Sequence, residues 1–141
     1  MVSILIAEDE PDLLNVVASM LEELGMEVIK ARNGAEALVM QDEYEGDIDL
    51  LLTDVVMPEL NGVKLAELFV AVREETRVIF MSGYPANGKM ARVPLPDQAV
   101  LLAKPVNYEK LVLIMKNILD EDYSPGDDGD IDLQRWQVAN S

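Results

Sequence analysis

The sequence predicts an α/β protein built on a doubly wound parallel sheet of five strands. Its 141 residues are enough for one domain, and half of them are hydrophobic, which is enough to fill a single core. Five short apolar runs alternate with segments whose apolar residues recur at helical spacing. The runs are apolar throughout, which is typical of parallel strands that helices cover on both faces.

The expected elements follow one another with short connections. The first helix carries Leu14, Val17 and Leu21 on one face, and Gly25 follows it as a C-cap residue would. Asn33-Gly34 forms a turn that leads into the second helix. The predicted order is strand 3–7, helix 12–24, strand 27–31, helix 35–41, strand 48–54, helix 62–73, strand 77–83, strand 99–104 and helix 108–119.

Residues 84–97 depart from this alternation, because their three prolines leave room for only about one turn of helix. We therefore expect the fourth crossover of the sheet to be irregular. The domain is expected to cover residues 1–120, followed by an acidic C-terminal tail at 121–141. Trp136 lies in this tail among a few apolar residues, and either a docking segment or a disordered one is consistent with that pattern.

The composition excludes several classes of function. A formal net charge of −16 argues against a nucleic-acid partner, which would need a basic face, and is consistent with solubility or with steering of a basic partner. No cysteine or histidine is present, which excludes disulfides, thiolate nucleophiles and histidine bases. No apolar run approaches the ~20 residues that span a bilayer, and no signal peptide is recognisable, so we expect a cytoplasmic protein without membrane contact.

Polar side chains follow four of the strands, at the point where each strand ends. Glu8 and Asp9 follow the first strand, Asp54 ends the third, and Ser82 and Lys104 end the fourth and fifth. Right-handed crossovers bring the carboxyl ends of parallel strands to one edge, where α/β proteins bind ligands. Clustered carboxylates repel one another unless a cation lies between them. This arrangement predicts a Mg²⁺ site beside a carboxylate that could accept a phosphoryl group.

These motifs resemble the receiver domain of bacterial two-component response regulators over roughly residues 2–120. The resemblance implies the flavodoxin-like strand order 2-1-3-4-5. Receivers with a Ser-Gly-Tyr stretch at Ser82-Gly83-Tyr84, including some attached to hybrid histidine kinases, resemble this chain more closely than others do. The matching motifs are Glu8-Asp9-Glu10, Thr53-Asp54-Val55-Val56-Met57-Pro58, Asn61-Gly62, Ser82-Gly83 and Lys104-Pro105.

The resemblance implies a role for each residue at the sheet edge. Asp54 would be the phosphoacceptor, Ser82 would hydrogen-bond the incoming phosphoryl group, and Lys104 would pair with its oxygens. Mg²⁺ would be the cofactor, held by Asp9, Asp54 and the backbone carbonyl of Val56, with Glu8 acting through water. The peptide bond from Lys104 to Pro105 would be cis, as is usual in this family.

One position departs from the family pattern. Many receivers have an aromatic residue three positions before the lysine of the fifth strand, and this chain has Leu101 there. Tyr84, two residues after Ser82, could take its place. We expect Ser82, Tyr84 and the 85–97 loop to move on phosphorylation.

The sequence therefore predicts a phosphorylation-switched signalling module without activity on external substrates. A sensor histidine kinase or phosphotransfer protein would donate the phosphoryl group, and protein–protein contacts would carry the output. One alternative is an interaction module that is never phosphorylated. Another is a Mg²⁺-dependent aspartyl-phosphate phosphatase, but the second acid that such enzymes carry two residues after the nucleophile is replaced here by Val56.

Overall fold

The computed structural model describes residues 1–83, 95–96 and 99–119. Every described helix and strand begins and ends within two residues of its predicted position. The strands are β1 (Ser3–Ala7), β2 (Glu27–Ala31), β3 (Leu50–Asp54), β4 (Arg77–Ser82) and β5 (Val100–Ala103). The helices are α1 (Pro11–Glu23), α2 (Gly34–Glu43), α3 (Gly62–Val72) and α5 (Tyr108–Leu119).

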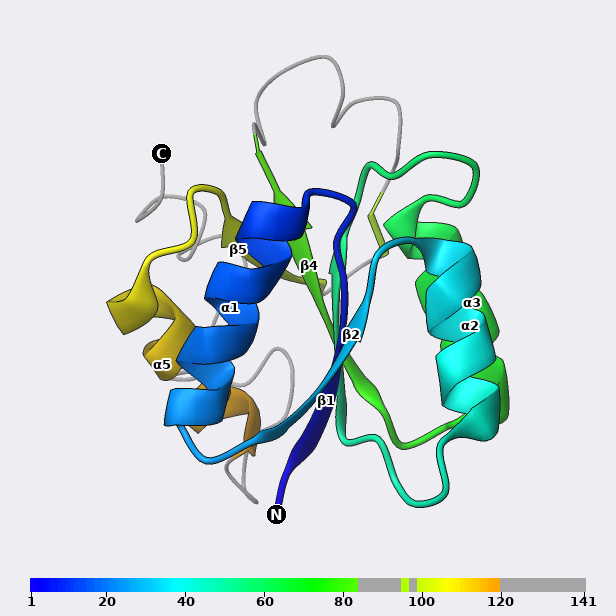
Figure 1. Cartoon of the computed structure of the whole chain (residues 1–141), viewed down its shortest axis with the longest axis horizontal. Helices are drawn as coiled ribbons and strands as arrows, with labels where there is room; N and C mark the ends of the chain where they lie inside the picture. Colours follow the sequence, from blue (N-terminus) through cyan, green and yellow to red (C-terminus); the bar gives the residue numbers. More distant parts are fainter. Residues whose placement is uncertain (84–94, 97–98, 120–141) are drawn as a thin grey trace.

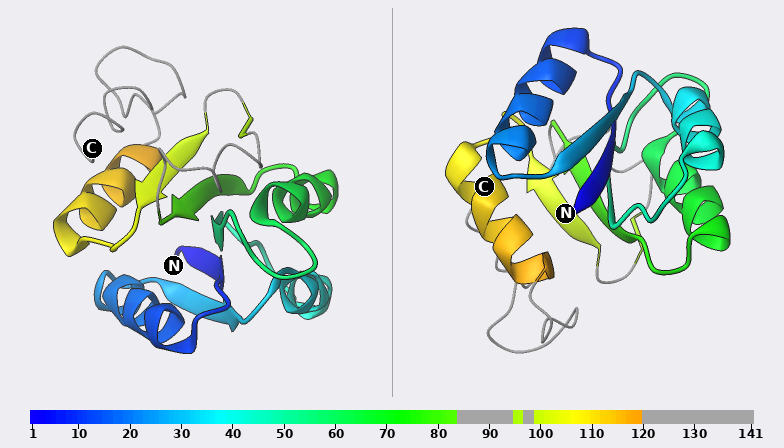
Figure 2. Two further views of the ribbon diagram at one scale, coloured as in Figure 1. Left: turned by 90° about the horizontal axis from the view of Figure 1, so that it is seen from above. Right: turned by 60° about the horizontal axis from the view of Figure 1, so that its bottom comes forward.

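The five strands form one parallel sheet in the order β2-β1-β3-β4-β5. Helices α1 and α5 cover one face of the sheet, and α2 and α3 cover the other (Figures 1 and 2). The predicted doubly wound, flavodoxin-like sheet is confirmed. The irregular crossover was expected at residues 84–97, of which only 95–96 are described, and Tyr84, the acidic tail and Trp136 lie outside the described residues.

Local signals in the sequence explain where the helices begin and end. The side-chain oxygen of Asn33 accepts a hydrogen bond from the Glu36 amide at 2.8 Å and so caps α2. Asn61 caps α3 in the same way, with the Lys64 amide at 2.9 Å. Gly25 follows α1 with a φ of 89°, a conformation that glycine adopts without steric cost, as the sequence predicts.

The centre of the sheet is fully buried, whereas the edge strand β2 is largely half-exposed. Strands β1 and β3 consist of buried residues throughout, because helices lie over both of their faces. The parallel register pairs Ala7 with Thr53, Asp54 with Met81, and Ser82 with Ala103. All strands therefore end at one edge of the sheet, and the residues that follow them meet there.

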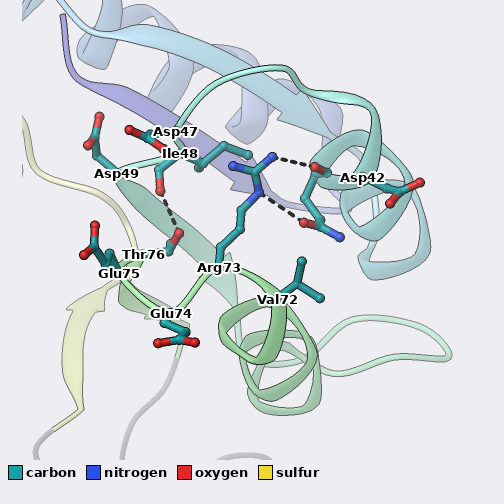
Figure 3. A pocket seen from close by; sticks show the side chains of 10 residues that line it. Asp42, Asp47, Ile48, Asp49, Val72, Arg73, Glu74, Glu75 and Thr76 are labelled. Carbon is teal, nitrogen blue, oxygen red and sulfur yellow. Dashed lines mark hydrogen bonds between the residues drawn. The ribbon is translucent and has the colours of Figure 1, made fainter.

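At the opposite end of the sheet, where the strands begin, the side chain of Arg73 links the C-terminus of α3 to the C-terminus of α2 (Figure 3). The Arg73 guanidinium donates to the side chain of Gln41 at 3.1 Å and to the carbonyls of Gln41, Tyr44 and Gly46 at 2.7, 2.9 and 2.7 Å. The last carbonyls of a helix have no partner within the helix, so these bonds satisfy the C-terminus of α2. No helix in the described ranges is long and apolar enough to cross a membrane.

Candidate functional site

Backbone hydrogen bonds continue one residue beyond the strand ends and fix the residues of the site. The Glu8 amide donates to the carbonyl of Ala31 at 3.1 Å, and the Lys104 amide donates to the carbonyl of Ser82 at 2.8 Å. The side chains of Glu8 and Asp54 are held below the surface, with 1% and 7% of each residue exposed. Two acidic residues are therefore buried at the carboxyl edge of the sheet, where water screens their charge only weakly.

Lys104 lies between the two buried carboxylates. Its ammonium nitrogen is 3.0 Å from Oδ2 of Asp54 and 3.3 Å from Oε1 of Glu8, and it donates a hydrogen bond to each. Oε2 of Glu8 is also close, at 3.1 Å, but the geometry makes that contact ionic rather than a hydrogen bond. The Lys104 side chain is only 18% exposed, so these ion pairs are stronger than those of surface lysines.

Backbone amides also contact the two carboxylates. Oε1 of Glu8 accepts from the Glu10 amide at 3.2 Å, and Oδ1 of Asp54 lies 3.4 Å from the Val56 amide. These contacts come from the loops that follow the strands. The position of each amide relative to its carboxylate therefore depends on the path that the loop takes after the strand.

An acidic cluster suited to a divalent cation lies at this edge. Ligand oxygens of Glu8, Asp9 and Asp54 lie within 4.8 Å of one another, and Asp9 is exposed whereas the other two are buried. A set of carboxylate oxygens is what Mg²⁺ prefers. Oε2 of Glu8 is buried and accepts no hydrogen bond from the described residues, although the Lys104 ammonium lies 3.1 Å away, so its lone pairs can still take a water bound to a cation. The residues present thus fit a Mg²⁺ ion.

Burial shifts the protonation equilibria of the two carboxylates, and the neighbouring charges modify these shifts. Burial, and to a smaller extent the Asp54 carboxylate, raise the pKa of Glu8 to about 7 against the opposing effect of Lys104. Burial also raises the pKa of Asp54, again against the influence of Lys104. Burial alone would lower the pKa of Lys104, but the two carboxylates outweigh it and the pKa lies above its usual value. One lysine does not fully compensate the cluster.

Gly62 brings the start of α3 against the end of β3. Its amide donates to the carbonyl of Val55 at 2.8 Å. A Cβ atom at position 62 would overlap the carbonyl oxygen of Asp54 and would lie 3.1 Å from Oγ1 of Thr53. That Thr53 hydroxyl donates to the Asp54 carbonyl at 3.0 Å. Sequence reasoning used Gly62 only as part of a motif, although a glycine at the first helical position signals such a close approach.

The structure brings Glu8, Asp9, Asp54 and Lys104 into one cluster, as the strand ends predict. Ser82 is buried at the end of β4, beside β5, and is joined to Lys104 through the backbone.

The remaining sequence-predicted positions also have defined places. Val56 is exposed and directs its amide toward Asp54. The expected cis bond between Lys104 and Pro105 is present. Leu101, which occupies the position of the missing aromatic residue, is buried in β5 as part of the hydrophobic core.

Fold and site together define the class of this protein. It is a flavodoxin-like α/β domain that carries buried carboxylates and a lysine at the carboxyl edge of its sheet. The family model described as "Response regulator receiver domain" matches residues 4–116. The chain therefore belongs to the response regulator receiver domain family and is a receiver domain of two-component signalling.

Similar proteins include free-standing and kinase-attached receivers. The response regulator receiver protein CpdR of Brucella abortus is 33% identical over 82% of this chain and 95% of its own length. Sensor kinase CckA of the same organism is 29% identical over 84% of this chain, which spans only 13% of that kinase. The structure of response regulator TrrA from Thermotoga maritima, a complex with Mg²⁺-BeF, superposes with a TM-score of 0.68 at 26% identity, over 84% of this chain and all of that one.

Proposed function

We propose that this receiver domain accepts a phosphoryl group onto Asp54, and that the resulting acyl phosphate changes its affinity for a protein target. One observation carries the proposal: the Asp54 carboxylate is buried at the sheet edge with its Oδ2 3.0 Å from the Lys104 ammonium. The pair combines a nucleophilic oxygen with a positive charge, the two requirements of phosphoryl transfer. The match to the receiver family supports the same reading.

The donor in this proposal is a phosphohistidine of a sensor kinase or a phosphotransfer protein. An Asp54 oxygen attacks phosphorus in line, and the P–N bond breaks as the acyl phosphate P–O bond forms. The electron pair of the broken bond returns to the imidazole, which leaves as a neutral ring when its other nitrogen carries a proton. The Lys104 ammonium offsets charge on the phosphoryl oxygens, and the Ser82 hydroxyl hydrogen-bonds one of them.

Mg²⁺ is the proposed cofactor, with Asp9, Asp54 and the Val56 carbonyl as ligands and Glu8 acting through water. When bound, it would neutralise charge on the carboxylates and on the incoming phosphoryl group. The buried Glu8 oxygen that accepts no hydrogen bond and the oxygen-only cluster support this assignment. The complex of the similar TrrA with Mg²⁺-BeF also supports it.

The chain is proposed to catalyse only its own phosphorylation and dephosphorylation. In the proposed site, no acidic side chain stands two residues after Asp54, because that position is Val56. A phosphatase acting on external substrates would need a general acid or base there.

A cavity beside the site supports a protein as the donor. It has a volume of about 530 Å³ and lies between the first half of α1 and the segment that follows β5, where Lys104 lines it. Leu13, Val16 and Val106 give it an apolar wall, and Val16 is 50% exposed. A donor histidine must come within bonding distance of Asp54, so its protein would contact this neighbouring surface.

Mass spectrometry of the intact protein tests the phosphoryl transfer. Incubation with a small phosphodonor and Mg²⁺ should add one phosphate, and Asp54→Asn or a chelator should prevent it. Asp47→Asn, at an exposed acid on the opposite edge, is the matched control and should leave the adduct unchanged. Absence of any adduct at saturating donor and metal, together with no transfer from a histidine kinase, would instead identify an interaction module that is not phosphorylated.

The donor surface is tested separately. Val16→Asp should slow transfer from a phosphorylated protein donor by about tenfold or more, because it places a charge in an apolar contact. It should not slow phosphorylation by a small phosphodonor. Val39→Asp is the matched control, since Val39 is 55% exposed on α2, over the other face of the sheet. If Val16→Asp and Val39→Asp accept the phosphoryl group from the protein donor at the same rate, the exposed surface of α1 is not the contact for the donor.

A further inference from the structure

The loop between β3 and α3 contains a strained turn. Glu59 has a φ of 68°, in the left-handed region that residues with a side chain rarely adopt. The Leu60 amide donates to the carbonyl of Pro58 at 2.7 Å, which closes a tight three-residue turn around Glu59. Such a conformation persists only where the surroundings hold it in place. The loop begins at Val55, directly after the phosphoacceptor.

The first turn of α2 packs against this loop and restricts its position. Leu60 packs directly against Gly34: a Cβ atom at position 34 would lie 2.9 Å from Cδ2 of Leu60 and 3.1 Å from its Cβ and Cγ. Leu60 is half-buried and also packs against the hydrophobic core. The absence of a side chain at Gly34 thus lets a leucine that lies 26 positions further along the chain approach the helix backbone.

The other end of the loop is fixed independently. Asn61 caps α3 through the Lys64 amide at 2.9 Å, and Gly62 packs against the Asp54 carbonyl with no room for a side chain. A shift of Leu60 is therefore transmitted toward the Val56 end of the loop. Pro58 restricts the backbone between these points, because its ring fixes φ.

We propose that Leu60, seated on Gly34, is a positioning residue for the phosphorylation site. It holds the strained turn at Glu59 and through it the backbone of Val56, which contacts the Asp54 carboxylate. The inference rests on the proposed function, because it assumes that the Val56 carbonyl is a Mg²⁺ ligand. It adds that the start of α2, which contributes no side chain to the cluster, controls metal affinity.

Gly34→Ala in the full chain tests the proposal. The added methyl group displaces Leu60, and the dissociation constant for Mg²⁺, measured by calorimetric titration, should rise by about tenfold, as for other groups that orient metal ligands. Phosphorylation by a small donor at limiting Mg²⁺ should slow in parallel and recover at saturating Mg²⁺. Leu60→Ala removes the side chain that packs on Gly34 and should raise the dissociation constant for Mg²⁺ in the same way. It serves as the test if Gly34→Ala fails to fold.

A second substitution separates positioning from stability. Glycine at position 59 adopts a positive φ without strain, so Glu59→Gly added to Gly34→Ala should restore Mg²⁺ affinity to near the wild-type value. Ile118→Val is the matched control: Ile118 is buried in α5, remote from the loop, so its truncation should lower stability and leave Mg²⁺ affinity unchanged.

The outcomes distinguish the proposal from the function on which it rests. A wild-type domain that neither binds Mg²⁺ nor accepts a phosphoryl group overturns both. Wild-type binding with equal affinity in Gly34→Ala and Leu60→Ala overturns the positioning role alone. A loss of affinity that Glu59→Gly does not restore also overturns it, because the effect would then arise from α2 and not from the turn.

Discussion

Replacing Glu8 by glutamine tests whether a buried carboxylate at the sheet edge lowers stability at neutral pH. Burial and the Asp54 carboxylate raise the Glu8 pKa from 4.5 to about 7. Between these two values the folded protein binds more protons than the unfolded chain does. Stability therefore falls as the pH rises through this window. The contribution of the protonated side chain is fully present only below about pH 4.5 and is lost above pH 7.

The magnitude follows from the size of the pKa shift. A shift of about 2.5 pH units corresponds to about 3 kcal/mol of unfolding free energy between the two ends of the window. This value is an upper limit, since Lys104 and the surrounding loops can relax when Glu8 ionises. Glutamine has nearly the same shape as protonated glutamate. Glu8→Gln should therefore keep the stability that the wild type loses on ionisation.

Urea unfolding of both proteins at pH 5 to 8, with a chelator present, measures the effect. The difference in unfolding free energy should grow with pH and should favour Glu8→Gln by up to about 3 kcal/mol at pH 8. Added Mg²⁺ should reverse the order, because a bound cation favours the ionised carboxylate. Glu10→Gln, at an exposed carboxylate nearby, should follow the wild type. Parallel pH profiles for the wild type and Glu8→Gln would refute the reasoning.

Two further predictions concern contacts that hold the ends of the helices. Gly62→Ala should lower the unfolding free energy by at least about 2 kcal/mol in urea, because its Cβ would overlap the Asp54 carbonyl, whereas Gly83→Ala, whose Cβ would meet no atom of the described residues within 4 Å, should be nearly neutral. Equal stability of these two variants would contradict the close approach. Arg73→Ala should cost about 2–4 kcal/mol and should increase amide exchange at the end of α2, since it leaves carbonyls such as that of Gln41 without partners. Unchanged exchange there would show that water replaces the guanidinium.

The fold and the position of the candidate site could be predicted because both follow from strand order and strand ends. Apolar runs identified the strands, and the handedness of crossovers then placed every strand end at one edge. Residues at the end of a strand or directly after it, such as Asp54 and Lys104, needed no side-chain information to be placed there. Proximity at the edge therefore follows from topology alone, and the structure confirms it for these residues and for Glu8 and Asp9.

Contacts between elements that are far apart in the sequence could not be predicted in this way. The packing of Leu60 on Gly34 joins the β3–α3 loop to the first turn of α2, two segments with no shared local pattern, and each residue alone is consistent with an ordinary turn. The φ of Glu59 is set by those neighbours and not by its own preference. The network around Arg73 likewise joins α2 and α3 across 32 positions of sequence. Such features depend on packing between elements, which short-range propensities do not contain.

The charge balance at the sheet edge bears on whether the proposed phosphoryl transfer requires a cation. Glu8, Asp9 and Asp54 carry three negative charges when ionised, and within the described cluster Lys104 supplies one positive charge in return. Burial first, and then repulsion by the Asp54 carboxylate, raise the pKa of Glu8 although Lys104 lies beside it, so ionised Glu8 is disfavoured even without a phosphoryl group. A dianionic phosphoryl group would increase the repulsion in a weakly screened pocket. We therefore expect a divalent cation to be required for phosphorylation, and raising the pH above 7 to increase the affinity for that cation as Glu8 ionises.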